Sequence, residues 1–110
     1  MAITTHVLDT MNGRPAAGVS VELLQSDGSG WRSVGRGATD ADGRLRTLLP
    51  EAPVPGVYRL RFDTGGYFGG RGLRGFYPEV LITFEVAEGN AHYHVPLLLS
   101  PFGYSTYRGS

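Results

Sequence analysis

Hydrophobic and polar residues alternate in three short stretches of the chain. The hydrophobic positions are Val19, Val21 and Leu23 in the first stretch, Tyr58, Leu60 and Phe62 in the second, and Ile82, Phe84 and Val86 in the third. Side chains of a β-strand point alternately to its two faces, so residues two positions apart share a face. This period therefore predicts half-buried strands over residues 18–24, 57–62 and 80–86.

Five further segments are also expected to be strands. They cover residues 3–8, 31–39, 44–48, 92–99 and 102–107. Asp42 and Gly43 fit a tight turn that leads into the strand beginning at Arg44. Residues 88–90 (Glu-Gly-Asn) have the composition of a turn after the strand that ends at Val86.

Only one segment of the chain is suited to a helix. Asp63 and Thr64 provide a cap for a helix over residues 65–73, but the glycines within this segment limit the helix to one or two turns. Short strands at regular spacing, with no amphipathic helix between them, predict an all-β fold. We expect a two-sheet β-sandwich of antiparallel strands whose alternate side chains fill one core.

The composition narrows the classes of protein and partner. A chain of 110 residues has room for one domain only, spanning residues 1–110. Ten basic residues balance ten acidic ones, which argues against nucleic acid and anionic membranes as partners. All the basic residues are arginine and cysteine is absent, so Schiff-base lysines, thiolate nucleophiles and cysteine-bound zinc are excluded. The sequence has no signal-peptide pattern and no apolar run near the ~20 residues of a membrane span, so a cytoplasmic protein is expected.

The three histidines all fall on strand faces that point away from the core. The apolar face of the strand over 92–99 consists of Tyr93, Val95, Leu97 and Leu99. His92 and His94 therefore face the other way, and His6 faces away from the larger apolar residues of the first strand. Leu8 and Pro96 share these outward faces, which suggests that another subunit covers them.

An outward imidazole taken alone is typical of a solvated surface residue. Together, His6, His92 and His94 could bind a zinc ion with water as its fourth ligand. No carboxylate stands beside His92 or His94 in the sequence to orient its ring, so we favour a site without a metal. Arg44, directly after a turn, is the most natural clamp for an anion, although an arginine in this position is often only a solvated flank.

Several motifs spread along the chain closely resemble those of one family. They are Thr5-His6-Val7-Leu8-Asp9, Asp42-Gly43-Arg44, His92-Tyr93-His94-Val95-Pro96 and the terminal Tyr107-Arg108-Gly109-Ser110. The chain resembles the 5-hydroxyisourate hydrolases, transthyretin-like enzymes of urate breakdown, over nearly its whole length. The terminal tetrapeptide is the most specific element, because transthyretin itself, the hormone carrier of the same fold, lacks it.

The resemblance implies a prealbumin (transthyretin)-like sandwich of two four-stranded sheets with one short helix. It also implies a homotetramer whose active sites lie in the channel between dimers, and no cofactor. His6, Arg44, His94 and Ser110 match the family's catalytic positions. Tyr107 and Arg108 stand beside Ser110 and, with Arg44, are expected to bind the substrate.

The implied reaction is the addition of water to the C6 carbonyl of 5-hydroxyisourate, which opens the N1–C6 bond and gives 2-oxo-4-hydroxy-4-carboxy-5-ureidoimidazoline. We expect one of His6 and His94 to remove a proton from water while the other assists the leaving nitrogen. The sequence leaves open which histidine is the base, and whether Ser110 acts through its hydroxyl or its terminal carboxylate. Two other functions stay open: a transthyretin-type carrier of a small aromatic ligand, and a structural or adhesive module.

Overall fold

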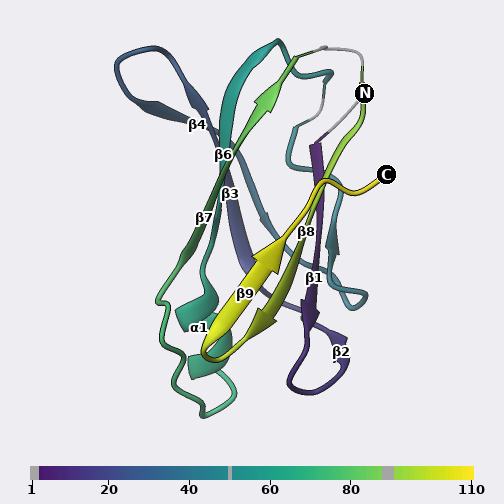
Figure 1. Cartoon of the computed structure of the whole chain (residues 1–110), viewed down its shortest axis with the longest axis vertical. Coiled ribbons are helices and arrows are strands. Elements are labelled where there is room, and N and C mark those ends of the chain that lie inside the picture. The colour runs from purple at the N-terminus through teal and green to yellow at the C-terminus, as the bar shows by residue number, and fades with distance from the viewer. Residues whose placement is uncertain (1–2, 50, 88–90) are drawn as a thin grey trace.

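The strands form two sheets that face each other, as the alternating pattern predicted (Figure 1). The computed structural model describes residues 3–49, 51–87 and 91–110. The elements are β1 (Ile3–Asp9), β2 (Arg14–Pro15), β3 (Ser20–Ser26), β4 (Trp31–Ala38), β5 (Arg44–Leu45), β6 (Gly56–Phe62), α1 (Thr64–Gly69), β7 (Val80–Val86), β8 (Tyr93–Ser100) and β9 (Gly103–Thr106). The turn expected at residues 88–90 lies outside the described residues. An all-β sandwich with one short helix is therefore confirmed.

The two sheets differ slightly from the expected four strands each. The first sheet has the order β2-β1-β8-β9 with β5 also paired to β1, and the second sheet has the order β4-β3-β6-β7. β8 occupies one edge of β1 along its whole length, so β2 and β5 share the opposite edge. The first sheet therefore contains five strands but is only four strands wide. β2 was not predicted, because two residues are too few to show a period.

The prediction that all strands are antiparallel is wrong for one pair. β1 and β8 run parallel, with Thr4 opposite His94 and His6 opposite Pro96. A tight hairpin forces neighbouring strands to be antiparallel, but these two strands come from opposite ends of the chain. No local turn chemistry sets their direction, so the sequence pattern could not reveal it.

The strand predicted over residues 44–48 is shorter in the structure. β5 ends at Leu45, and the chain then leaves the edge of β1 so that Leu48 is buried against the other sheet. A side chain on Gly35 of β4 would overlap the Leu48 carbonyl oxygen, so glycine permits this close approach. The two sheets are thus joined at this side by a buried crossing rather than by a longer strand.

Helix α1 begins as predicted but ends earlier. The Asp63 side chain accepts a hydrogen bond from the backbone N–H of Gly66 at 3.0 Å, which caps the first turn. Gly69 ends the helix, whereas the prediction extended it to Leu73, because glycine-rich sequence cannot sustain further turns. This six-residue helix lies at the end of the sandwich opposite the C-terminus (Figure 1). Over the described ranges, no helix is long and apolar enough to span a membrane.

A buried polar contact fixes the helix to β1. The Tyr67 hydroxyl donates a hydrogen bond of 2.8 Å to the Asp9 carboxylate, which also accepts from the backbone and side chain of Asn12. Burial raises the pKa of Asp9, but the hydrogen bonds from Tyr67 and Asn12 outweigh burial and lower it overall. Burial and the bond to Asp9 raise the pKa of Tyr67 to about 12. Asp9 thus stays ionised and Tyr67 neutral, and the contact secures the end of the strand that carries His6.

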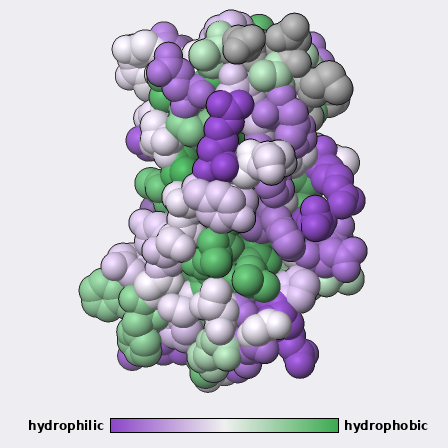
Figure 2. Space-filling model, turned by 45° about the vertical axis from the view of Figure 1, so that its right-hand side comes forward, coloured by the Kyte–Doolittle hydropathy of each residue, from purple (hydrophilic) through white to green (hydrophobic). Residues whose placement is uncertain are grey.

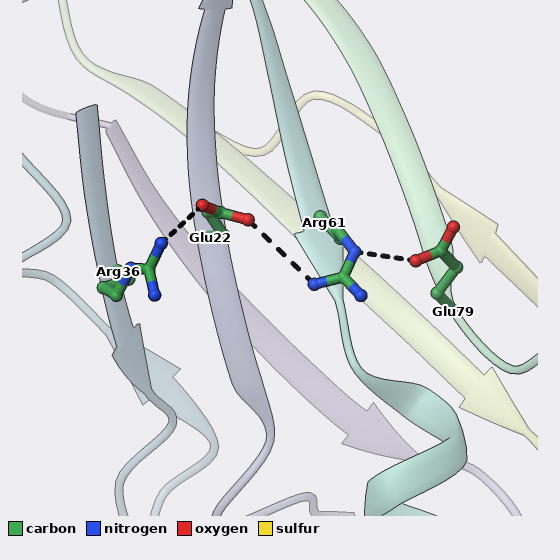
Figure 3. A network of polar contacts seen from close by, with 4 residues as sticks. All are labelled: Glu22, Arg36, Arg61 and Glu79. Carbon is green, nitrogen blue, oxygen red and sulfur yellow. Dashed lines mark hydrogen bonds and ion pairs between the residues drawn. The ribbon is translucent and has the colours of Figure 1, made fainter. Parts of the chain in front are cut away.

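The outer face of the second sheet carries a chain of surface ion pairs (Figure 3). Arg36 contacts Glu22 at 2.8 Å, Glu22 contacts Arg61 at 4.0 Å, and Arg61 contacts Glu79 at 2.7 Å. Exposed pairs of this kind contribute little to stability, about 0–1 kcal/mol each. These charges therefore satisfy one another on the outer face of this sheet.

Candidate active site

The outer face of the first sheet gathers polar side chains from three strands. On β1, Ile3, Thr5 and Val7 are buried in the core, so Thr4 and His6 point outward. The parallel register sets His94 of β8 beside Thr4, and the β5 register sets Arg44 beside His6. Directly paired residues in a sheet project to the same face, so these four side chains form a contiguous group.

A tight turn determines where Arg44 enters this group. One oxygen of Asp40 accepts hydrogen bonds from the backbone N–H groups of Asp42 at 2.9 Å and Arg44 at 3.0 Å. Gly43 has a φ of +74°, and a Cβ there would lie 2.5 Å from the Val7 carbonyl oxygen. Only glycine allows the turn to press against β1 in this way. The Asp42-Gly43 turn predicted from the sequence therefore delivers Arg44 to its place opposite His6.

The end of the chain closes the other side of the group. The Gly109 N–H donates a hydrogen bond of 2.8 Å to the His94 carbonyl, forming an isolated antiparallel bridge. A Cβ at Gly109 would lie 2.5 Å from Cδ2 of His94, so a larger residue could not lie against the imidazole. This contact places Ser110 next to the cluster of outward side chains that includes Thr4 and His94.

These segments enclose a polar cavity of about 170 Å³. It is lined by Thr4, Thr5, Arg44, Arg46, His92, His94 and Ser110. Three of the predicted catalytic residues, Arg44, His94 and Ser110, thus line one cavity. The fourth, His6, is not in the lining but lies beside Arg44 in the sheet. Figure 2 shows hydrophilic side chains grouped next to a compact apolar patch on the surface.

Thr4 and Arg46 belong to the cavity but were missed by the sequence reasoning. Arg46 stands two residues after Arg44, a spacing that in an extended chain places both side chains on one side. This spacing could therefore have predicted Arg46 as a neighbour of Arg44. Thr4 gave none, because a threonine in a strand is ordinary until its partner strand is known.

His94 is held by a short contact and is half-buried. Oγ1 of Thr4 lies 2.8 Å from Nδ1 of His94 and 3.2 Å from Nε2 of His92. Burial lowers the pKa of His94, and electrostatic interaction with His92, His6, Arg44 and Arg46 lowers it further. His94 is therefore neutral at neutral pH, the state in which an imidazole can accept a proton.

Tyr107 and Arg108 lie at a different, mainly apolar cavity of about 250 Å³. Residues of β7, β8 and the tail line it, and His94 borders both cavities. Arg108 stacks on the Tyr93 ring, with 4.6 Å between the guanidinium carbon and the ring centre. The side chain of Tyr107 is exposed. Within one chain, then, the structure does not bring these two predicted substrate-binding residues into the polar cavity.

A zinc site of the kind considered from the sequence would need the side chains of His6, His92 and His94 to surround one metal ion. Among the residues that the structure describes, no group of three or more histidine, aspartate or glutamate side chains is placed to hold a metal ion. His92 and His94 are instead stacked, with 6.3 Å between ring centres, and both contact Thr4. This arrangement favours hydrogen bonding over metal coordination.

Comparison with known proteins gives consistent matches along the whole chain. The family model described as "HIUase/Transthyretin family" matches residues 3–109. A 5-hydroxyisourate hydrolase of Salmonella dublin is 50% identical over 109 residues, which is 98% of this chain and 80% of that protein. The solved structure of Klebsiella pneumoniae 5-hydroxyisourate hydrolase has a TM-score of 0.89 at 34% identity, with 100% of both chains covered. Sea bream transthyretin in complex with thyroxine has a TM-score of 0.92 at 35% identity, covering 99% of this chain and 95% of that one.

Proposed function

Since the chain belongs to the HIUase/transthyretin family, we propose that it hydrolyses 5-hydroxyisourate at the polar cavity of Arg44, His94 and Ser110. The fold cannot separate an enzyme from a carrier, because a hydrolase and a transthyretin both superpose well on it. One observation carries the proposal: a neutral imidazole and guanidinium groups line the same cavity. A carrier of an aromatic ligand gains little from that chemistry, whereas hydrolysis of an anionic cyclic amide needs it.

The reaction needs one proton acceptor and one proton donor. Water forms a bond to C6 as an imidazole takes up one of its protons, the N1–C6 bond breaks and N1 receives a proton from the donor. The carboxyl group formed at C6 then releases the second proton of the water to solvent and becomes a carboxylate. The half-buried His94 and its neighbour His6 are the two candidate imidazoles. No covalent intermediate, metal or cofactor enters this scheme.

Arg44 is proposed to hold the anionic substrate and to stabilise negative charge on the C6 oxygen. A guanidinium offers several donors in a rigid, planar arrangement that matches a flat polar ring. Ser110 is proposed to contact the substrate from the tail, and Tyr107 and Arg108 are proposed to bind it from the neighbouring cavity. We also propose that residues 1–110 form a single hydrolase domain and that the protein is located in the cytoplasm.

We expect the active form to be a homotetramer. A cavity of about 170 Å³ is smaller than the roughly 300 Å³ at which most ligand pockets begin, so a second chain would complete it. Leu8 and Leu98 on the same outward face are only half-buried, which favours a protein partner there. Light scattering of the purified protein should give the mass of four chains. A fully active monomer would contradict the shared site.

The activity itself can be tested with a coupled assay. Urate oxidase generates 5-hydroxyisourate, whose ultraviolet absorbance decays slowly without a catalyst. Adding the wild-type protein should accelerate this decay in proportion to the protein concentration, and treatment with a chelator should leave the rate unchanged. If the decay stays at its uncatalysed rate while the protein binds an aromatic ligand, the carrier function replaces the hydrolase.

A further inference from the structure

Thr4 lies between the two imidazoles that border the polar cavity. Its Oγ1 is 2.8 Å from Nδ1 of His94 and 3.2 Å from Nε2 of His92, and the residue is only 7% exposed. Resting on the proposed hydrolase function, we infer that Thr4 is a positioning residue that fixes the tautomer of His94 and so makes His94, rather than His6, the general base.

A hydroxyl group has one proton to donate and two lone pairs that accept. In a first arrangement Thr4 donates to Nδ1 of His94, so neutral His94 carries its proton on Nε2 and that nitrogen can only donate. In a second arrangement Nδ1–H of His94 donates to Thr4, and Thr4 donates to Nε2 of His92. Only the second arrangement leaves Nε2 of His94 with a free lone pair.

The second arrangement also fits the step that His94 must perform. When Nε2 takes up the proton released by the attacking water, both ring nitrogens of His94 carry a proton. The bond from Nδ1–H to Thr4 then stays in place, and no group has to rotate. In the first arrangement the Thr4 hydroxyl would have to turn away during the reaction, because a protonated Nδ1 cannot accept a hydrogen bond.

The surrounding structure holds Thr4 firmly enough for this role. Thr4 is paired with His94 in the parallel β1–β8 ladder, and its β-branched side chain has restricted rotation about the Cα–Cβ bond. His92, which is exposed, supplies the acceptor for the Thr4 proton. No comparable hydrogen bond is found for the His6 ring among the described residues, so within that part of the chain only the His94 ring of this pair has a group that selects its tautomer.

Replacing Thr4 tests the role through kinetics. Thr4→Val keeps the shape of the side chain but removes the hydroxyl, and Thr4→Ser keeps the hydroxyl. A well-placed general base contributes roughly 100- to 10,000-fold, so a base with the wrong tautomer should lower kcat about 10- to 100-fold in Thr4→Val. KM should change little, and Thr4→Ser should recover most of the rate. A higher KM with unchanged kcat would show instead that Thr4 only contacts the substrate.

Nuclear magnetic resonance of ¹⁵N-labelled histidine tests the tautomer without relying on activity. In the wild type, neutral His94 should carry its proton on Nδ1, and in Thr4→Val the proton should shift toward Nε2. The His94 signals are assigned by their loss in His94→Gln. A proton on Nε2 of His94 in the wild type overturns the inference even if Thr4→Val does not fold. If the wild type shows the expected tautomer but has no hydrolase activity, the proposed function is wrong, and the assignment of His94 as the base is wrong with it.

Discussion

A His94→Asn variant is expected to hydrolyse 5-hydroxyisourate about 100- to 10,000-fold more slowly than the wild type, the usual contribution of a general base. His94 borders both cavities, and burial together with the neighbouring histidines and arginines lowers its pKa, so its ring is neutral at neutral pH. Asparagine has a similar polar outline but cannot accept the proton of water at neutral pH. The rate is measured from the ultraviolet decay of enzymatically generated substrate.

The variant must retain the wild-type fold for this result to be informative. Its circular dichroism spectrum, urea midpoint and assembly state should match those of the wild type. Equal acceleration of the decay by both proteins would remove His94 from catalysis.

The same residue sets the expected pH dependence. Protonation of His94 removes the base, so kcat/KM should fall as the pH drops through the His94 pKa. Burial and the neighbouring histidines and arginines place this pKa below the ordinary value of 6.5, so the acid limb should have its midpoint below pH 6.5. A midpoint above 6.5, or an unchanged limb in the residual activity of His94→Asn, would contradict this assignment.

Replacing Arg44 with glutamine is expected to have the second large effect. The variant loses the positive charge beside the cavity but keeps a polar side chain at the end of the same turn. Losing a preorganised donor to a developing oxyanion costs roughly 3–4 kcal/mol in studied enzymes, so kcat/KM should fall about 100- to 1,000-fold. Steady-state kinetics over a range of substrate concentrations measures the loss.

Arg14→Gln provides the matched control for Arg44→Gln. Arg14 is an exposed arginine on β2, which pairs with the same edge of β1 as β5 but does not border the polar cavity. The control removes the same charge from the same sheet, and its kcat/KM should stay within about twofold of the wild type. Equal losses in both variants would mean that net charge, and not the position of Arg44, governs the rate.

Much of the candidate site could be predicted because local chemistry determines it. The alternation around His94 gave its outward direction, and the Asp42-Gly43 turn gave the start of β5. The motif resemblance added Ser110, which no period or spacing indicated. Thr4 was missed because its role depends on His94, a residue 90 positions away that no local pattern connects to it.

The sequence by itself determined which faces of the strands are buried, where the helix is capped and where the chain turns, because each of these depends on residues that are neighbours along the chain. The tertiary structure decided that β1 and β8 run parallel and that Gly109 bridges to His94. It also separated Tyr107 and Arg108 from the polar cavity. Contacts between distant strands are selected by the packing of the whole core and by the pairing of backbone hydrogen bonds, and no single segment contains that information.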